Sequence, residues 1–217
     1  MELFVVIGLG RFGSAVAEEL CRRGHEVLAI DTDEAAVQRM ADRVTQAVVG
    51  DCQDMEVLRT LGVKNASCAV VAFSNDIGTS ALISLNLKEL GIPRLICKAR
   101  SYSHQELLRR IGADQVVYPE HESGRTLART LANREILNYI EMSDRYSIVK
   151  IRVPDSWKGK TLRDLDVRAK YQVNVVAIQS TDGSLQTVPQ PAYRFRSGDM
   201  VFTLGEDDNN ERVVRLE

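Results

Sequence analysis

The stretch FVVIGLGRFG, residues 4–13, decides the fold of this chain. It begins with the apolar run 4–7, which predicts a fully buried parallel strand, and continues into Gly8-x-Gly10-x-x-Gly13. A helical pattern follows at once. In a strand, turn and helix of this spacing, the first glycine permits the tight turn, the second lets a pyrophosphate approach the backbone, and the third lets the helix pack close to the strand. The free N–H groups at the start of the helix then face the phosphates.

A glycine motif alone is a weak sign of nucleotide binding, and the second predicted strand strengthens it. Residues 26–30 form another apolar run, and Asp31 follows it, 23 residues after Gly8. Dinucleotide-binding folds place at this point the acid that accepts hydrogen bonds from ribose hydroxyls. An acid there also repels a 2′-phosphate, which disfavours NADP. The alternative interpretation is a glycine turn that binds no ligand.

The composition is that of an ordinary globular protein. The chain has 217 residues, 44% of them hydrophobic and 27% charged, which is enough for one large or two small domains. A formal charge of −2 argues against binding nucleic acid through bulk charge. The apolar runs are too short for a membrane span, and we expect no signal peptide. We interpret the four cysteines as reduced core thiols of a cytoplasmic protein, since none forms a CxxC pair.

Strands and helices alternate along the first 120 residues. This alternation predicts an α/β fold with a Rossmann-like, doubly wound parallel sheet over residues 1–120. The expected strands are 4–7, 26–30, 46–50, 68–73, 94–99 and 115–118. The expected helices after the first are 34–42, 54–61, 77–90 and one capped by Ser103 that ends at Gly112.

Residues 121–217 do not continue the alternation of strands and helices seen in the first 120 residues. Residues 121–138 have helical spacing without a following strand, so we expect a connecting helix or an oligomer contact there. Residues 139–217 predict a small α+β domain with a hairpin turn at Asp182-Gly183. A domain of that size has a limited core, which favours dimerisation through an exposed apolar face. Its expected strands are 146–153, 174–179, 184–188 and 200–204, with a helix over 162–170.

In an open parallel sheet, the ligand lies beyond the carboxyl ends of the strands. Asp33 could reach a ribose hydroxyl or could only cap the next helix. Asp51 lies where adenine would rest, although it could equally be a turn residue. The candidate binding residues at this edge are Gly8, Gly10, Arg11, Phe12, Gly13, Asp31, Asp33, Gly50, Asp51, Ser74, Asn75, Lys98 and Arg100.

Charged residues at this edge favour phosphate groups. The guanidinium of Arg11, inside the glycine turn, can clamp the oxygens of a β- or γ-phosphate, whereas the alternative is a solvated arginine. Lys98 and Arg100 are two residues apart and can share one face as their strand ends. Glu120 could hold a divalent cation against phosphates, or simply lie at a helix start.

Nothing in the sequence resembles a catalytic triad, a zinc-protease motif or paired catalytic carboxylates. We interpret His104 and His121 as surface histidines rather than catalytic bases. The residues therefore favour a nucleotide sensor with an attached small domain over an enzyme.

With these residues assembled, the sequence resembles the cytoplasmic regulatory subunits of bacterial Ktr/Trk potassium-uptake systems, which carry an RCK (regulator of K⁺ conductance) domain. The resemblance covers nearly the whole chain. It is carried by GLGRFG at 8–13, HEVLAID at 25–31, KAR at 98–100, YPE at 118–120, LNYIEMSDRYSIVKI at 137–151, GKTLRDLDVRAKYQVNVVAI at 159–178 and RSGDMVFTLG at 196–205.

The resemblance implies homodimers that assemble into an octameric ring beneath a membrane-embedded, K⁺-translocating subunit, at the inner face of the cell membrane. Such rings bind ATP or ADP, and in some members NAD(H), with ATP favouring the active state. Arg11 matches an arginine that touches the terminal phosphate, often across the dimer interface, and Lys98 matches a phosphate-contacting lysine. Glu120 matches a glutamate that binds an activating cation, for which Mg²⁺, Ca²⁺ and Na⁺ are the candidates. The acid in Gly50-Asp51 is a departure from some ATP-preferring relatives and leaves ATP and NAD(H) both open.

In some relatives the C-terminal subdomain binds cyclic di-AMP at its dimer interface. The corresponding region here contains Arg168, Tyr171, Val175, Val176 and Pro191. Two other functions remain as alternatives. The first is an NAD(H)-dependent oxidoreductase or redox sensor, which Asp31 suits and Arg11 opposes. The second is a transcriptional redox repressor, which would need a DNA-reading segment that the sequence does not show.

Overall fold

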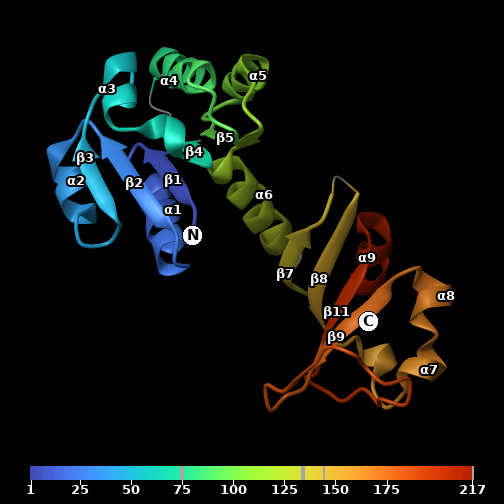
Figure 1. The fold of residues 1–217 in the computed structure, drawn as a ribbon. Coiled ribbons are helices and arrows are strands. Elements are labelled where there is room, and N and C mark those ends of the chain that lie inside the picture. The colour runs from blue at the N-terminus through green and yellow to red at the C-terminus, as the bar shows by residue number, and fades with distance from the viewer. Residues whose placement is uncertain (74–75, 133–134, 144, 217) are drawn as a thin grey trace. The chain divides into compact units, whose positions relative to one another are not determined.

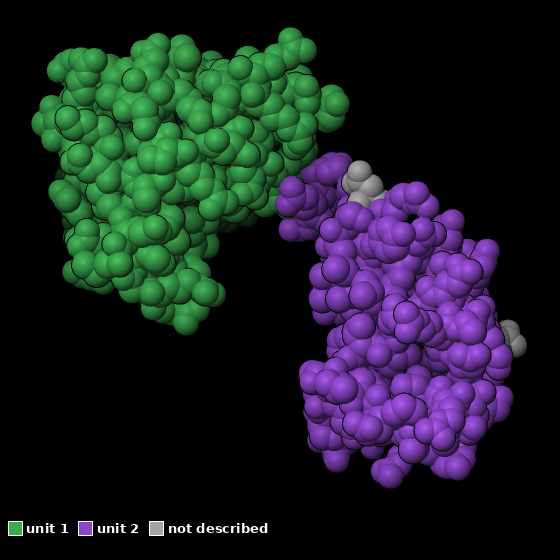
Figure 2. All heavy atoms as spheres, turned by 45° about the vertical axis from the view of Figure 1, so that its right-hand side comes forward, with its two compact units in different colours: residues 1–120 green, residues 121–217 purple. Residues whose placement is uncertain are grey.

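The computed structural model describes residues 1–73, 76–132, 135–143 and 145–216. It divides the chain into two compact units, Met1–Glu120 (unit 1) and His121–Glu217 (unit 2), coloured green and purple in Figure 2. Each unit has its own sheet and its own hydrophobic core, as a folding domain requires. Among the described helices, none has the length and apolar character needed to cross a membrane.

Unit 1 is built on a six-stranded sheet in which all neighbouring strands are parallel (Figure 1). The strand order is β3-β2-β1-β4-β5-β6, so the direction of winding reverses between β1 and β4. This order confirms the predicted Rossmann-like doubly wound sheet and places a ligand crevice at the ends of β1 and β4. The strands are β1 (Leu3–Ile7), β2 (Glu26–Asp31), β3 (Gln46–Val49), β4 (Cys68–Val71), β5 (Leu95–Lys98) and β6 (Gln115–Val117).

Both faces of this sheet are covered. Val5 and Ile7 of β1 enter one hydrophobic cluster, whereas Val6 enters the cluster on the other face, and all three are at most 4% exposed. β1 is therefore buried on both sides, as its unbroken apolar sequence predicts. Three of the four cysteines are buried and all four are free thiols, as expected. The helices are α1 (Arg11–Arg22), α2 (Glu34–Met40), α3 (Met55–Thr60), η1 (Val63–Asn65), α4 (Ile77–Glu89) and α5 (Tyr102–Ile111).

The glycine turn between β1 and α1 is shaped by the close approach of backbone atoms. Gly8 has a φ of 92°, and a Cβ there would lie 2.8 Å from the backbone nitrogen of Phe73, just after β4. A Cβ on Gly13 would lie 1.9 Å from the carbonyl oxygen of Gly8. At Gly10, by contrast, no atom of the described residues other than its neighbours along the chain lies within 4 Å of the Cβ position. The protein's own packing thus requires Gly8 and Gly13, whereas Gly10 borders open space.

Unit 2 contains an antiparallel five-stranded sheet of order β10-β9-β11-β8-β7, with its helices α7, α8 and α9 on one side (Figure 1). Asn210 of α9 fixes that helix to the sheet, because its amide nitrogen donates to Ser147 and its amide oxygen accepts from Thr203 at 2.9 Å. The elements are α6 (Pro119–Ala132), β7 (Ile136–Glu141), β8 (Tyr146–Arg152), η2 (Asp155–Trp157), α7 (Leu162–Leu165), α8 (Val167–Tyr171), β9 (Asn174–Gln179), β10 (Leu185–Gln186), β11 (Met200–Glu206) and α9 (Asp207–Val214).

The last turns of α6 are tied to the sheet of unit 2 by Arg129. Its guanidinium lies 4.5 Å from the centre of the Tyr139 ring, contacts the hydroxyl of that tyrosine and pairs with Glu141 at 3.2 Å. The Tyr139 hydroxyl in turn donates to Asp207, the first residue of α9, at 3.0 Å. One arginine therefore joins α6 to both β7 and α9.

Two predictions about helix ends were wrong, and the single helix expected over 162–170 is divided into α7 and α8 at Asp166, which has a φ of 45°. The helix expected over 121–138 ends at Ala132, and the apolar residues from Ile136 onward form the edge strand β7. The helix α5 is capped by Ser101, whose hydroxyl accepts from the backbone N–H of His104, and not by Ser103. In the first case apolar spacing over a few residues suited a helix and a strand equally well.

We expect Gly13→Ala to lower the free energy of unfolding by roughly 3 kcal/mol, because the new methyl group would overlap the carbonyl oxygen of Gly8. Urea unfolding followed by far-UV circular dichroism measures this. Gly10→Ala is the matched control in the same turn and should cost about 1 kcal/mol or less, since its backbone angles suit alanine and the space beside it is open. Equal losses in the two variants would contradict the packing described for the turn.

Candidate functional site

Asp31, at the end of β2, holds the glycine turn in place. Its Oδ2 accepts from the backbone N–H of Leu9 at 2.6 Å, and its Oδ1 accepts from the N–H of Asp33 at 2.9 Å. Both carboxylate oxygens thus bind backbone groups, and lone pairs remain for a further donor such as a ribose hydroxyl. Asp33 caps α2 by accepting from Ala35 at 3.0 Å, so the capping alternative considered for it is realised.

A cleft opens beside Asp31 at the carboxyl ends of the strands, where the fold predicts a ligand. Its volume is about 130 Å³, below the 300–1,000 Å³ usual for whole ligand pockets, so it can enclose only part of a nucleotide. Of the residues predicted from sequence, Gly8, Asp31, Gly50 and Asp51 line it. The lining residues that sequence reasoning missed are Ile7, Thr32, Cys52, Gln53, Phe73, Thr79 and Ile83.

The missed polar residues come from helix starts and turns at the same sheet edge. Thr79 lies in the first turn of α4 and its hydroxyl donates to Gln53 at 3.3 Å. Asp51 accepts from the backbone N–H of Gln53 at 3.0 Å, which is the turn role considered for it. The signal available in the sequence was position alone, because Gln53 and Thr79 each stand a few residues after a predicted strand. The predicted contacts Ser74 and Asn75 lie outside the described residues.

A second group of residues lies at the start of α1. Lys98, at the end of β5, pairs with Glu120 at 2.6 Å, and its ammonium lies 5.8 Å from the centre of the Phe12 ring. The pKa of Glu120 is lowered by this hydrogen bond and further by the charge of Arg11. Arg11 is exposed and has no hydrogen-bond or ion-pair partner among the described residues. We call Arg11, Lys98 and Glu120 the charged group.

Within the charged group, Glu120 already has a cationic partner. Its carboxylate, predicted to hold a cation, is paired with Lys98 of the same chain. Within the part of the chain that the structure describes, no three His, Cys, Asp or Glu side chains are placed to hold a metal ion. The protein side chains alone do not fit a cation there, so any cation would need phosphate oxygens or other added ligands.

Arg100 and His104 lie near the same edge of the sheet. Arg100 lies near Asp76, the N-cap of α4; a hydrogen bond from Thr79 lowers the pKa of Asp76, and the charge of Arg100 lowers it further. His104, predicted to be a surface histidine, is wholly buried, with its Nδ1 accepting from the backbone N–H of Arg100 at 3.4 Å. Burial lowers the pKa of His104, which keeps the imidazole neutral.

In unit 2, three of the five residues predicted for a second ligand surround one cavity. Arg168, Val175 and Pro191 line a space of about 290 Å³. Tyr171 packs on Trp157, with ring centres 6.3 Å apart, and Val176 is not among the lining residues. The structure thus brings three of the five predicted residues together at one cavity.

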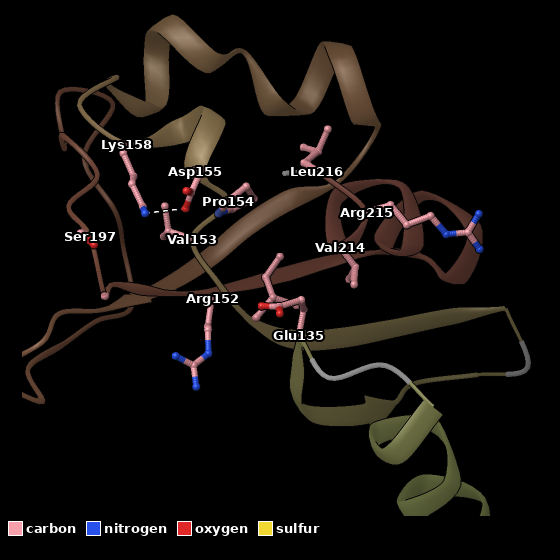
Figure 3. Close-up of a pocket in the computed structure, with 12 residues that line it drawn as sticks. Glu135, Arg152, Val153, Pro154, Asp155, Lys158, Ser197, Val214, Arg215 and Leu216 are labelled. Atoms are coloured by element: carbon pink, nitrogen blue, oxygen red, sulfur yellow. Dashed lines mark ion pairs between the residues drawn. The ribbon is translucent and has the colours of Figure 1, made fainter.

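Another cavity of about 530 Å³ lies between the end of β8 and the last residues of α9 (Figure 3). Two of its three cations have partners, since Lys158 pairs with Asp155 and Arg215 pairs with Glu211 at 2.8 Å. The side chain of Arg152 points away from the Lys158–Asp155 pair (Figure 3). These contacts leave no group of cations converging on the cavity.

Comparison with known families identifies both parts of the chain. The TrkA-N domain matches residues 4–119 and the TrkA-C domain matches residues 147–216. The Ktr system potassium uptake protein A of Bacillus subtilis is 39% identical over 209 residues, which cover 96% of this chain and 94% of the relative. The similarity therefore extends through both units.

Solved structures of an RCK-containing channel show the same fold. The GsuK channel bound to NAD is 26% identical, with a TM-score of 0.59, over 99% of this chain and 38% of that chain. GsuK bound to ADP is 31% identical, with a TM-score of 0.53, over 60% of this chain and 34% of that chain. This chain spans less than half the length of those solved chains.

We expect Asp31→Asn to lower the free energy of unfolding by about 1–3 kcal/mol, because the amide NH₂ would face a backbone N–H that the carboxylate now accepts from. Urea unfolding measures this. Asp33→Asn is the matched control and should change stability little, since asparagine caps helices as well as aspartate does. A loss at Asp33 equal to that at Asp31 would contradict the bridging role of Asp31.

We also expect Cys52 to resist alkylation by iodoacetamide at pH 8 in the folded protein, because it is 2% exposed. Burial, and then the charges of Asp51 and Asp31, raise the pKa of its thiol from 9.0 to about 12. The partly exposed Cys21 is the internal control, and mass spectrometry measures both. Since the folded pKa lies above the unfolded one, the contribution of Cys52 to stability falls as pH rises from about 9 to about 12. Labelling of Cys52 as fast as in urea would contradict this.

Proposed function

This chain belongs to the family of Ktr and Trk potassium-uptake proteins, and from that membership we propose that it is a regulatory subunit that senses ATP and ADP. On this proposal it acts on a membrane-embedded K⁺-translocating subunit, as a non-enzymatic cytoplasmic protein at the inner face of the membrane. The B. subtilis relative, a component of a Ktr potassium-uptake system, supports the partner.

The observation that carries the nucleotide role is the open space at the start of α1. Beyond its neighbours along the chain, Gly10 has no atom of the described residues within 4 Å of its Cβ position, and it provides no side chain to cap the helix. A phosphate seated there would meet the N–H groups and the positive end of α1, with Arg11 beside it. The cleft next to Asp31 would take the ribose and base.

The charged group offers a way to distinguish ATP from ADP. A γ-phosphate would reach Arg11, on the same or a neighbouring subunit, whereas ADP would leave that arginine without the contact. A ligand shifts a conformational equilibrium only by its difference in affinity for the two states. A tenfold bias needs about 1.4 kcal/mol, which one charge-assisted contact can supply.

NAD(H) is the second candidate ligand. GsuK binds both NAD and ADP on the same fold, and Asp31 suits an unphosphorylated ribose. An NAD(H)-dependent redox function is the alternative that this observation favours. The guanidinium of Arg11, which pairs with none of the described residues, weighs against it, since a dinucleotide needs room beyond its pyrophosphate.

Cations and a second nucleotide are further proposals. A Mg²⁺, Ca²⁺ or Na⁺ ion at Glu120 would bind together with nucleotide, because Lys98 must move off the carboxylate and phosphate oxygens must complete the ligand set. Cyclic di-AMP would use the cavity lined by Arg168, Val175 and Pro191.

We propose homodimers that assemble into an octameric ring. Helix α6 supports an intersubunit role, since none of its described residues is buried and Leu127 and Leu131 are 58% and 73% exposed. Apolar side chains this exposed on one helix favour contact with another chain.

Isothermal titration with ATP, ADP and NADH, with and without Mg²⁺, tests this function. We expect ATP and ADP to bind, and Arg11→Ala to weaken ATP binding about tenfold while changing ADP binding less, because only ATP has the γ-phosphate. Gly10→Ala should fold and yet weaken every nucleotide, since its methyl group would occupy the phosphate position.

Arg22→Ala is the matched control, because this arginine lies at the other end of α1 and pairs with Glu19. It should leave nucleotide binding unchanged. Binding of NADH alone, with Arg11→Ala indistinguishable from the wild type, would contradict the ATP/ADP proposal and favour the redox alternative.

A further inference from the structure

We propose that Asn86, in the third turn of α4, positions the turn that would hold the base of a nucleotide. This inference rests on the proposed nucleotide role of the cleft beside Asp31. Asn86 is not among the residues that line the cleft, so it acts through the turn and is a positioning residue. The turn follows β3, and four consecutive residues of it line the cleft; we call them the base turn: Gly50, Asp51, Cys52 and Gln53.

Asn86 is a polar side chain on the core side of α4. It is 7% exposed, and Ile83 and Leu87, which flank it on the helix, are at most 4% exposed and belong to the core of unit 1. Burying an amide beside such side chains is unfavourable unless the amide is hydrogen-bonded. The amide nitrogen of Asn86 donates to the backbone carbonyl of Gln53 at 2.9 Å. That bond offsets the burial and ties α4 to the base turn.

Among the described residues, two hydrogen bonds join the base turn to α4. Besides the bond from Asn86, the hydroxyl of Thr79 donates to the side-chain oxygen of Gln53 at 3.3 Å. Thr79 and Asn86 are seven residues apart, so they lie on the same side of α4, about 10 Å apart along its axis. Gln53 is thus held by its side chain at one turn of the helix and by its backbone at a later one. The bond from Thr79 is exposed, so water competes with it, whereas the bond from Asn86 is partly buried and fixes the backbone.

The bond from Asn86 also determines where the carboxylate of Asp51 lies. Oδ1 of Asp51 accepts from the backbone N–H of Gln53 at 3.0 Å and from its side-chain amide at 3.3 Å. Oδ2 lies 3.5 Å from the same amide and keeps lone pairs for a further donor. Because both donors belong to Gln53, a shift of Gln53 would move the carboxylate as well. Holding one backbone carbonyl therefore fixes the side chains of Asp51 and Gln53 together.

The order of the strands directs the base of a bound nucleotide to the base turn. Phosphates at the start of α1 would follow β1, and Asp31, which suits a ribose hydroxyl, ends β2. The next strand in this direction is β3, which the base turn follows (Figure 1). ATP and ADP share the ribose and the base and differ only in their phosphates. Asn86 should therefore affect both nucleotides equally, whereas Arg11 should affect the difference between them.

Isothermal titration of the full chain with ATP and ADP tests this role. We expect Asn86→Ala to weaken both nucleotides by the same factor, roughly tenfold, because the carbonyl of Gln53 loses its partner and the base turn is released. The ratio of the two affinities should stay at the wild-type value, unlike in Arg11→Ala. Ser84→Ala is the matched control, since this buried hydroxyl of α4 donates to Ser80 at 2.7 Å within the helix and should leave both affinities unchanged.

Hydrogen–deuterium exchange of the same variants without nucleotide gives a second readout. Asn86→Ala should speed exchange over residues 51–58 and leave residues 4–20 unchanged, whereas Ser84→Ala should leave both ranges unchanged. Asn86→Asp keeps the volume of the side chain and, when ionised, replaces the donor by an acceptor, so we expect the same results from it. Circular dichroism shows which variants fold, and Asn86→Asp replaces Asn86→Ala if the smaller side chain prevents folding.

The outcomes separate this role from the nucleotide function on which it rests. Wild-type affinities for ATP and ADP in a folded variant of Asn86, or a loss for ATP alone, would overturn the role of Asn86. Unchanged exchange over residues 51–58 in that variant would overturn it equally. A wild-type chain that binds neither nucleotide would instead overturn the proposed function, and this inference with it.

Discussion

The carboxylate of Asp31 joins the end of β2 to the turn that follows β1, and the geometry of the candidate nucleotide site depends on that link. The carboxylate accepts from Leu9 in the turn and from Asp33 at the start of α2, so a charge-assisted hydrogen bond ties the turn to the end of β2. With the turn fixed, Gly8 and Gly13 can bring α1 close against the sheet. The start of α1, and with it Arg11, is thereby directed to the edge where β1 and β4 diverge.

The acidic and the basic side chains of the candidate site differ in the partners that they already have. The aspartates beside the cleft have structural partners already, since Asp31 binds the turn, Asp33 caps α2 and Asp51 binds the next turn. Among the residues that the structure describes, Arg11 has no hydrogen-bond or ion-pair partner, whereas Lys98 pairs with the exposed Glu120. The carboxylates beside the cleft thus already bind backbone groups, whereas the guanidinium of Arg11 can pair with an added anion. That asymmetry suits a site in which the base and ribose are held alike and the terminal phosphate is what differs.

The sequence predicted what depends on local pattern and missed what depends on contacts between distant segments. The strand, turn and helix of residues 4–13 and the alternation that follows were sufficient for the parallel sheet, because each element has its own apolar period. Lys98 and Glu120 were each predicted to meet a ligand, yet their pairing requires the packed sheet. Burial of His104 depends equally on its neighbours in space. Around Ile136, apolar spacing suited two structures, and the strand formed because Tyr139 could join the core of unit 2.

The tie between Arg129 and Tyr139 has a mechanical consequence. It anchors one end of α6 to the sheet of unit 2, and the 14 residues of this helix extend over about 21 Å. If α6 tilts as a rigid rod relative to the sheet of unit 2, the Arg129 end is the point about which it turns. A tilt of about 10° about that point would move the other end by about 4 Å, which is most of one helical turn. A small rotation at this one cluster of side chains would in this way become a displacement as large as a side chain.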